Sequence, residues 1–509
     1  MEKMVTELKT NKRVIVIGAG VAGLSTAIRL QKEGYQVDLF EKESLPGGKM
    51  NQIEKDGFRF DVGPTIVMMP EIYREIFEIA GKDPEDYIPM KRIDPMYRSY
   101  FDKGQDYIDV SSDLTKLMKT LEDIDPEDAA GFLRYLSSVY DRFLIAKDYF
   151  LQRPFRDKKD FYNPFMLKQG LKLKTFDSAT NSISKFVKNE KIRNMLTFQT
   201  LYIGVSPNNG PSLYTIIPMI ELLYGIWYIE GGMHKMAEGM ASVLEDLGGQ
   251  IHYDSEVTEI LIEDGKAKGI AVNGRQELAD YVMCNADFPY AMKSLVKEKS
   301  AKGKYTDQKI DKMKYSCSCF VMYLGMDRQY DELEHLHTFI FSDDVDKNLE
   351  QVFSGEVIED PSVYVVASSK VDPTAAPAGK ENLYILVPVA ELSTAKYDWE
   401  DEVTVQYYRK KALDAVSNLP GMENIENEII SESMMTPIDF KERFNAYNGA
   451  TFGLQPTLTQ SNHWRPQAKA EACENLYFTG SSTHPGAGVP IVLLSGKIAA
   501  DELMLDDRG

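Results

Sequence analysis

Cysteine is scarce in this chain of 509 residues, which contains only Cys284, Cys317, Cys319 and Cys473. Only Cys317 and Cys319 lie close together, and no histidine or further cysteine completes a metal-ligand spacing around them. Their alternating surroundings, "YSCSCFVMYLGMD", predict a strand with two buried thiols and no metal site. Reduced thiols are typical of cytoplasmic proteins, and a cytoplasmic location is what we expect.

Positive charge is also in deficit, with 58 lysines and arginines against 78 aspartates and glutamates, a net charge of -20. Binding to nucleic acid depends on lysine and arginine neutralising phosphates, so we expect no nucleic-acid partner. The same deficit argues against attachment to anionic lipid by overall charge.

Long uninterrupted apolar runs are missing as well. The best candidate, "SLYTIIPMIELLYGIWYIEGG", is broken by Pro218, Glu221 and Gly225, whereas a membrane span needs about 20 apolar residues. A hydrophobic share of 43% and a charged share of 27% are typical of a globular protein. The length predicts two or three domains.

The N-terminal stretch "KRVIVIGAGVAGLSTAIRLQKEGYQVDLFEKE" has the pattern of a βαβ unit. A β-branched strand over 14–17 is followed by glycines in GxGxxG spacing, a helix over Leu24–Lys32 and a second strand in "YQVDLFE". The glycines allow a tight turn, close approach of a pyrophosphate and close packing of the helix on the strand. We expect the pyrophosphate at the helix N-terminus, contacted by Gly18, Gly20, Val21, Ala22 and Gly23.

The residues after this unit favour FAD over NAD as the dinucleotide. Glu41, followed by Lys42, ends the second strand where a carboxylate can accept hydrogen bonds from ribose hydroxyls. A second glycine pair in "EKESLPGGKMNQ" lets the backbone approach the pyrophosphate from its other side, although an ordinary turn is the alternative. A β-hairpin arm and the loop 61–65 then lead into the expected flavin site. This part of the prediction comprises Gly47, Gly48, Lys49, Gly63, Pro64 and Thr65.

The C-terminal part also has the pattern of a cofactor site. "NLYFTG" predicts a strand, and "SSTHPGAGVP" a loop that leads into the last helix, with Pro490 in its first turn. In the FAD/NAD(P)-linked amine-oxidase superfamily, which this arrangement resembles, such a strand and helix complete the flavin site. The resemblance implies contacts from Gly480, Gly486, Gly488, Val489 and Pro490, and a backbone contact to the adenine from Val257. No second GxGxxG follows a strand, so NAD(P)H is not an expected reductant.

Four motifs together resemble the bacterial carotenoid (phytoene) desaturase family over nearly the whole chain: "GPTIVMMP", "FQTLYIGVSPNNGPSLYTIIPMIE", "GGMHKMAEGM" and "STHPGAGVPIV". The stretches "FDVGPTIVMMPEIY", "KDPEDYI", "RPFRDKKDFYN" and "HWRPQ" are most similar to its branch that acts on dehydrosqualene (4,4'-diapophytoene). One departure is Lys49, where many relatives have arginine, because lysine offers phosphate no bidentate contact.

The resemblance implies an FAD-dependent oxidoreductase that introduces successive double bonds into a C30 polyene, from dehydrosqualene to diaponeurosporene. It implies hydride transfer to flavin N5, with oxygen or a quinone as electron acceptor. A C40 phytoene desaturase and a terminal diapocarotenoid oxygenase remain open on the same fold. A flavin amine oxidase and a non-catalytic flavin-binding carrier are the more remote alternatives.

The fold class that follows is α/β: an FAD/NAD(P)-binding Rossmann-like domain of amine-oxidase and phytoene-desaturase type, with an interleaved α+β substrate domain. We expect the FAD-binding domain to comprise 1–80, 225–299 and the flavin-capping segment 463–509. A mostly helical, membrane-facing region at 81–224 and a second substrate segment at 300–462 would complete the chain.

Two stretches suit an apolar substrate taken from a membrane. "LYTIIPMIELLYGIWYI" (213–229) is apolar and aromatic, as for the lining of a tunnel, although a buried core helix is the alternative. Residues 153–175 interleave aromatic side chains with Arg153, Arg156, Lys158, Lys159, Lys168, Lys172 and Lys174. This basic, aromatic stretch suits a surface that rests on a membrane, although a solvated basic helix is the alternative.

No side chain is singled out as catalytic, because the sequence shows no Ser–His–Asp or Cys–His arrangement. His484 lies in the flavin loop, where packing is as reasonable a role as chemistry. Asp61, Glu221, Glu230 and Asp287 could each approach the site as a base. We expect the flavin itself to be the catalytic centre.

Overall fold

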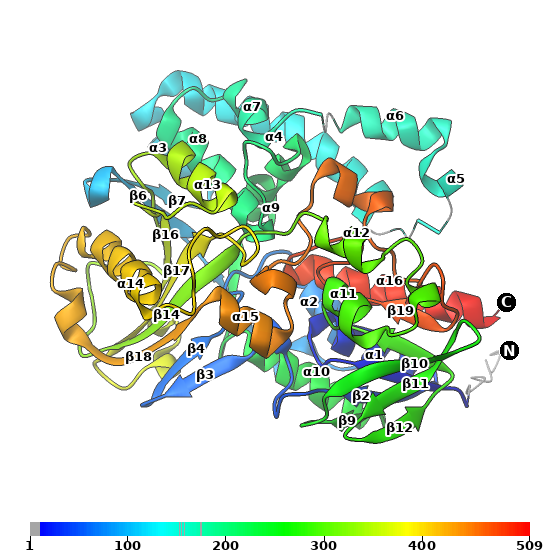
Figure 1. The fold of residues 1–509 in the computed structure, drawn as a ribbon. Coiled ribbons are helices and arrows are strands. Elements are labelled where there is room, and N and C mark those ends of the chain that lie inside the picture. Colours follow the sequence, from blue (N-terminus) through cyan, green and yellow to red (C-terminus); the bar gives the residue numbers. More distant parts are fainter. Residues whose placement is uncertain (1–10, 152, 154, 157, 174–175, 509) are drawn as a thin grey trace, which may run out of the picture.

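A five-stranded parallel sheet lies at the centre of the nucleotide-binding half of the computed structural model, which describes residues 11–508 apart from 152, 154, 157 and 174–175 (Figure 1). Its strand order is β19-β13-β1-β2-β9. The strands are β1 (Arg13–Ile17), β2 (Gln36–Phe40), β9 (Gln250–His252), β13 (Tyr281–Cys284) and β19 (Leu476–Phe478). Every neighbouring pair is parallel, so segments far apart in the sequence build one sheet.

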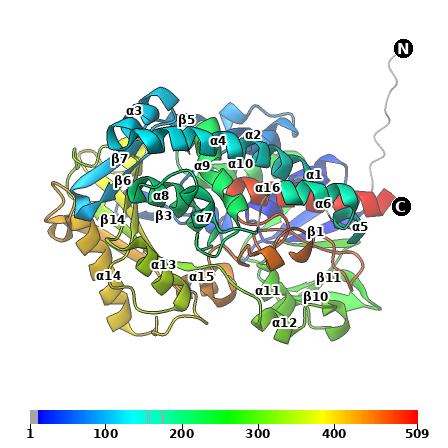
Figure 2. The same cartoon turned by 90° about the horizontal axis from the view of Figure 1, so that it is seen from above.

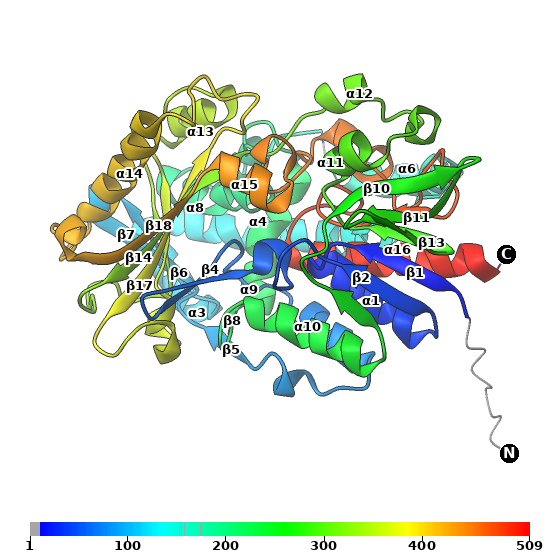
Figure 3. The same cartoon turned by 60° about the horizontal axis from the view of Figure 1, so that its bottom comes forward.

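Both faces of this sheet are covered, which is why its first strand is apolar and buried from Val14 to Ile17. Val14 and Val16 pack in one hydrophobic cluster with α1 (Val21–Lys32), α10 (His234–Asp246) and α16 (Val489–Arg508). Ile15 and Ile17 point the other way, into a cluster with β10 (Val257–Glu263) and β11 (Lys266–Val272), whose sheet is completed by β12 (Arg275–Leu278). Figure 3 shows α1 and α10 on one side of β1 and β2, and β10 and β11 on the other. Helix α1 begins at Val21, earlier than the predicted Leu24.

The second half is built on a mixed seven-stranded sheet of order β18-β14-β17-β16-β15-β6-β7. Its strands are β6 (Tyr97–Phe101), β7 (Asp106–Val110), β14 (Ser318–Met326), β15 (His337–Ile340), β16 (Val363–Val366), β17 (Glu381–Val389) and β18 (Ile429–Met435). One face packs against α14 (Glu402–Ser417) and residues of α13 (Val345–Ser354). The other face turns toward the helical layer and the cavity described below.

Helices α3 to α9 form a layer at the top of the view in Figure 1, and Figure 2 shows this layer from above. They are α3 (Leu114–Ile124), α4 (Pro126–Ala146), α5 (Lys158–Phe161), α6 (Pro164–Lys172), α7 (Ala179–Ser184), α8 (Glu190–Thr197) and α9 (Ile216–Tyr224). The remaining elements are β3 (Gln52–Lys55), β4 (Phe58–Asp61), β5 (Met90–Ile93), β8 (Ile226–Ile229), α2 (Pro70–Glu78), α11 (Phe288–Tyr290), α12 (Asp307–Asp311) and α15 (Pro437–Phe444).

The predicted fold class is confirmed, since a parallel α/β sheet is interleaved with a separate mixed sheet and helices. The region 81–224 is less uniformly helical than expected, because β6 and β7 within it extend the seven-stranded sheet. The exact domain limits stay a prediction. Among the described residues, no helix is long and apolar enough to span a membrane.

Candidate active site

A cavity of about 970 Å³ lies where the parallel sheet, the seven-stranded sheet and the helical layer meet. The predicted cofactor residues that line it are Gly18, Gly20, Val21, Glu41, Lys42, Gly47, Gly48, Lys49, Gly63, Pro64, Thr65, Val257, Gly480, Gly486, Gly488, Val489 and Pro490. Ala22 and Gly23 are not among the lining residues and are buried within α1. The structure therefore gathers almost all of the predicted set around one space.

The loop between β1 and α1 has the geometry of an anion cradle. Gly18 has a φ of +91°, which favours glycine, and Gly20 precedes α1 without any side-chain cap. No side-chain cap therefore occupies the N–H groups in the first turn of α1, whose first residue Val21 lines the cavity. A Cβ on Gly23 would lie 2.1 Å from the carbonyl oxygen of Gly18, so this glycine serves the packing of the helix on the loop.

The second glycine pair packs against the first loop. The N–H of Gly47 donates to the carbonyl oxygen of Ala19 at 2.9 Å, and Gly47 has a φ of +114°. Glu41 accepts from the N–H of Ala19 at 2.6 Å through Oε2 and from the N–H of Glu43 at 3.0 Å through Oε1. Burial raises the pKa of the Glu41 carboxyl. Two glycine loops, an open helix N-terminus and a carboxylate on one cavity fit the pyrophosphate and ribose of a dinucleotide.

Lys49 turns toward a polar cluster inside the cavity. Its Nζ donates to the carbonyl oxygen of Thr451 at 2.7 Å. Asp287 accepts from the hydroxyl of Ser482 and, at 2.9 Å, from the N–H of Tyr447. Burial lowers the pKa of Lys49 and raises that of Asp287, while each charge favours the other. Lys49 and Asp287 are therefore two buried groups of opposite charge that lie close to the glycine-rich loops.

The C-terminal loop is held by Arg465, a residue that sequence reasoning did not select. Its guanidinium is buried and donates to the carbonyl oxygens of Leu454, Gln460, Ser481 and Thr483. Among the described residues its acceptors are four carbonyl oxygens and no carboxylate, so the side chain holds backbone segments together. Its place in "HWRPQ", in the segment that leads to the returning strand, was the available signal.

His484 has a packing role in the structure. Its Nε2 is 2.9 Å from the carbonyl oxygen of Arg153, and its ring contacts Phe155 at a centroid distance of 5.2 Å. Burial lowers its pKa to about 4, so the imidazole is neutral at physiological pH.

Of the four carboxylates considered as bases, only Asp287 lines the cavity. Asp61 accepts from the N–H of Met233 at 2.8 Å, and burial raises its pKa to about 7. Glu230 is exposed. Glu221 is buried on α9, where Tyr97 donates to it at 3.2 Å, and burial raises its pKa to about 8. At neutral pH Glu221 is therefore mostly protonated.

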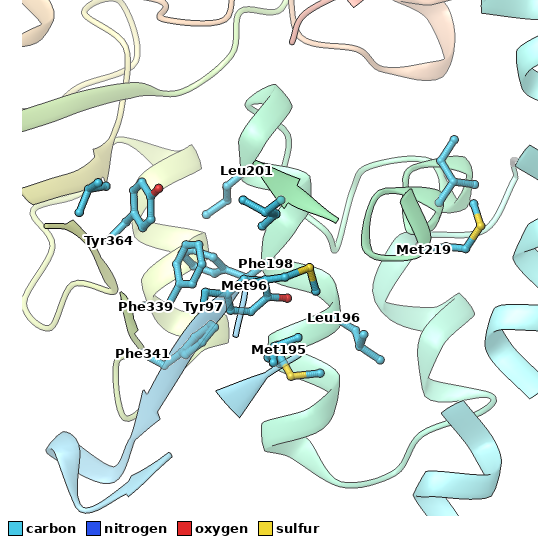
Figure 4. Close-up of a cluster of buried hydrophobic side chains, with 14 of the residues drawn as sticks. Met96, Tyr97, Met195, Leu196, Phe198, Leu201, Met219, Phe339, Phe341 and Tyr364 are labelled. Carbon is cyan, nitrogen blue, oxygen red and sulfur yellow. The ribbon is translucent and has the colours of Figure 1, made fainter. Parts of the chain in front are cut away.

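The rest of the cavity is apolar and runs away from the glycine loops. At one end it is lined by Phe198, Leu201, Tyr202, Phe339 and Tyr364, several of which Figure 4 shows in the buried cluster beside the seven-stranded sheet. At the other end its lining side chains are themselves exposed, Leu171 by 70% and Phe176 by 83%. Side chains that line a cavity and also face solvent mark its mouth. The apolar stretch 213–229 contributes to the lining through Leu213, Tyr214, Ile216, Ile217 and Ile220.

Comparison with known proteins fits this geometry. Residues 21–504 match the family described as flavin containing amine oxidoreductase. The chain belongs to this family. Membership of the flavin containing amine oxidoreductases confirms the expected oxidoreductase activity with FAD as cofactor.

Relatives within this family extend over nearly the full length. The chain is 45% identical over 496 residues to a 4,4'-diapophytoene desaturase (4,4'-diaponeurosporene-forming) of Staphylococcus haemolyticus, covering 97% of this chain and 99% of the relative. It is equally 45% identical over 501 residues to the protein of the same description from Staphylococcus aureus strain Newman, covering 98% and 100%. A crystal structure of an oxidoreductase from Methanosarcina mazei has a TM-score of 0.64 at 17% identity, covering 97% and 100%. The resemblance to desaturases inferred from the motifs is confirmed.

Proposed function

We propose that this protein is an FAD-dependent 4,4'-diapophytoene desaturase that introduces successive double bonds into a C30 polyene. The observation that carries the proposal is one continuous cavity, in which the glycine loops of a dinucleotide site lead into an apolar space with an exposed mouth. The similarity to 4,4'-diapophytoene desaturases over nearly the whole chain supports this substrate.

The two halves of the cavity have different roles in this proposal: one holds FAD and the other holds the polyene. FAD, when bound, supplies a hydride acceptor and so allows a C–H bond to be oxidised without a metal. The N-terminus of α1, with Gly18 and Gly20, is assigned to the pyrophosphate, and Glu41 to the ribose. Backbone of the loop 480–490, held by Arg465, is assigned to the flavin ring. The aromatic and aliphatic lining holds the polyene and excludes water.

Proton removal needs little help from the chain in this proposal. Asp287 is the one lining carboxylate among the four considered, and it is already bonded to Ser482 and the N–H of Tyr447. A proton beside a developing positive charge on a polyene is acidic, so a weak base is sufficient. Oxygen or a quinone is the electron acceptor that we propose.

The mouth of the cavity suits contact with a membrane surface. The side chains that both line the cavity and are exposed are Tyr162, Leu167, Leu171, Phe176 and Trp464. Lys168 and Lys172 lie exposed on α6, the helix that carries Leu167 and Leu171. Arg156 of the predicted basic stretch is instead paired with Glu502 at 2.6 Å. Lys174 and the side chain of Lys158 lie outside the described residues. We therefore assign peripheral membrane contact to α6 and its flanks, where the lipid-dissolved substrate enters.

The membrane proposal is tested by vesicle flotation. Leu171→Glu is expected to reduce binding to phosphatidylcholine vesicles several-fold, because a charge at this position must leave the apolar boundary. Val403→Glu is the matched control, since Val403 is 73% exposed on α14, far along the sequence from the mouth. Equal binding by both variants would contradict the assignment.

The activity is tested by pigment formation in a colourless host that makes only 15-cis 4,4'-diapophytoene. Expression of this chain is expected to yield yellow products with stepped polyene absorption, whose band positions give the number of conjugated bonds. Gly23→Val is the inactive control, because a Cβ at Gly23 would lie 2.1 Å from the backbone carbonyl oxygen of Gly18. A colourless extract beside flavin-loaded protein would overturn the proposal, and carbonyl-bearing products would indicate the terminal oxygenase.

A further inference from the structure

A row of aromatic side chains crosses the seven-stranded sheet on the face that turns toward the cavity. In spatial order it runs Tyr323, Tyr384, Tyr364, Phe339 and Tyr97, one from each of β14, β17, β16, β15 and β6. Successive ring centroids lie 5.6, 6.3, 4.8 and 5.2 Å apart. Figure 4 shows Tyr364, Phe339 and Tyr97 next to one another. Because strand side chains alternate between faces, the register of five strands is needed to align this row.

Only the middle of this aromatic row borders the cavity. Tyr384, Tyr364 and Phe339 line it, whereas Tyr97 and Tyr323 do not. Phe339 is packed from behind by Tyr97, and beyond β15 Phe341 stacks on Phe101 at 4.9 Å. These residues are all buried. The cavity therefore stops against the row, at the end opposite to the exposed mouth.

Hydroxyl groups tie the row to the segment that precedes α2. The Tyr323 hydroxyl donates to the carbonyl oxygen of Val62 at 2.7 Å, and that of Tyr384 to the carbonyl oxygen of Gly63 at 3.3 Å. The Tyr364 hydroxyl is 2.8 Å from the hydroxyl of Thr65. Gly63 and Thr65 line the cavity and belong to the predicted flavin set. Three hydroxyls in succession thus hold the row at a fixed distance from this segment.

His337 gives the row a further anchor. Its Nδ1 is 2.8 Å from the Tyr364 hydroxyl, which is thereby held between His337 and Thr65. The histidine is fully buried, and burial lowers its pKa to about 3, so it stays neutral. Phe339 is the one lining member without a hydroxyl, and its truncation breaks no hydrogen bond of its side chain.

We propose that Phe339, Tyr364 and Tyr384 form a stop against which the inserted end of the polyene rests, and that this stop determines chain-length specificity. This inference rests on the proposed function and identifies the residues that would select its substrate by length. Since the stop is bonded to the segment 62–65, the length of chain that fits between it and the flavin site is fixed. A C40 polyene carries one more isoprene unit on each side of its centre than a C30 polyene, and needs a deeper space to present its central bonds.

The stop is tested by truncating Phe339 and comparing C30 with C40 substrates in purified, flavin-loaded protein. Phe339→Ala is expected to raise the ratio of C40 to C30 turnover by about tenfold, because the longer chain gains apolar space for several methylene groups. Phe339→Leu is expected to raise it less. Phe341→Ala is the matched control, because it removes an equally buried phenyl ring that does not line the cavity.

A binding measurement keeps this test independent of turnover. Saturated C30 and C40 isoprenoid hydrocarbons, delivered in detergent micelles, are titrated into flavin-loaded protein and followed by tryptophan fluorescence. Wild type is expected to favour the C30 chain, and Phe339→Ala to lose that preference. The proposal is overturned if both Phe339 variants hold flavin and keep the wild-type ratios, or if Phe341→Ala changes them equally. Failure of wild type to convert any polyene would contradict the proposed activity. The binding preference would still show whether these residues limit the length of the bound chain.

Discussion

The Nε atom of Arg465 donates to the carbonyl oxygen of Thr483 at 3.0 Å, and so joins the segment before β19 to the loop after it. The same guanidinium bonds to the carbonyl oxygen of Ser481 at 2.5 Å. Within the described part of the chain this buried cation donates only to carbonyl oxygens, and burial lowers its pKa to about 10. It remains charged at neutral pH, beside the loop assigned to the flavin ring.

Arg465→Lys is expected to loosen this loop. Lysine keeps the charge but lacks the planar fork that reaches four carbonyls, so buried acceptors lose their donors at about 1 to 3 kcal/mol each. We expect weaker FAD binding and a lower unfolding temperature, measured by flavin fluorescence during heating. Arg328→Lys, at a side chain 41% exposed, is the control and should change neither.

Gly23→Ala is expected to lose FAD. The added Cβ would lie 2.1 Å from the carbonyl oxygen of Gly18, a backbone atom that cannot yield without moving the cradle. Gly170→Ala is the contrasting change, since a Cβ there meets nothing within 4 Å and α6 gains about 0.5 to 1 kcal/mol of helix propensity. The measurement is flavin content after purification. Full flavin occupancy in Gly23→Ala would contradict the packing role of this glycine.

Glu221→Gln is expected to change how stability depends on pH. Burial raises the pKa of the carboxyl from 4.5 to about 8, so the folded state binds the proton more tightly. The stabilisation is complete below pH 4.5 and is lost as pH rises toward 8, by at most about 1.4 kcal/mol per pH unit. The glutamine cannot titrate, so relative to wild type it gains stability between pH 5 and 8. Urea unfolding of flavin-loaded protein at both pH values measures this, and a pH-independent difference would contradict it.

Two buried tyrosine hydroxyls are expected to contribute differently to the free energy of unfolding. Tyr323→Phe removes the donor to the buried carbonyl of Val62 and should cost about 1 to 3 kcal/mol of unfolding free energy. Tyr73→Phe removes a buried hydroxyl with no hydrogen-bond partner among the described residues and should be neutral or stabilising. Urea denaturation of the two variants in parallel decides this, and equal losses would refute the distinction.

Much of the nucleotide half follows from the sequence because its signals are local. The β-branched strand, the glycine spacing and the carboxylate Glu41 lie within one short stretch, and the structure gathers them as expected. The return of the chain at 475–490 was also predicted from the sequence, because glycines followed by Pro490 are typical of a loop that leads into a helix.

The residues at the substrate end of the cavity could not be predicted in the same way. The aromatic row joins residues from Tyr97 to Tyr384, and each of them, alone in its strand, looks like an ordinary core residue. Their alignment depends on the register of five strands, which no local pattern specifies. Arg465 was missed for a related reason. Its acceptors are backbone carbonyls, which every residue has, so the sequence does not show which of them the guanidinium contacts.

The order of the parallel sheet has a consequence for biosynthesis. Strand β19 and helix α16 are translated after their partners in the fold, since β19 pairs with β13 and α16 packs against α1. A ribosome-bound chain that lacks residues 476–508 has the glycine cradle of α1 without the loop assigned to the flavin ring. Tight capture of the cofactor must therefore wait until residues 476–508 have been synthesised, which makes flavin loading a checkpoint that depends on both glycine-rich regions having folded together.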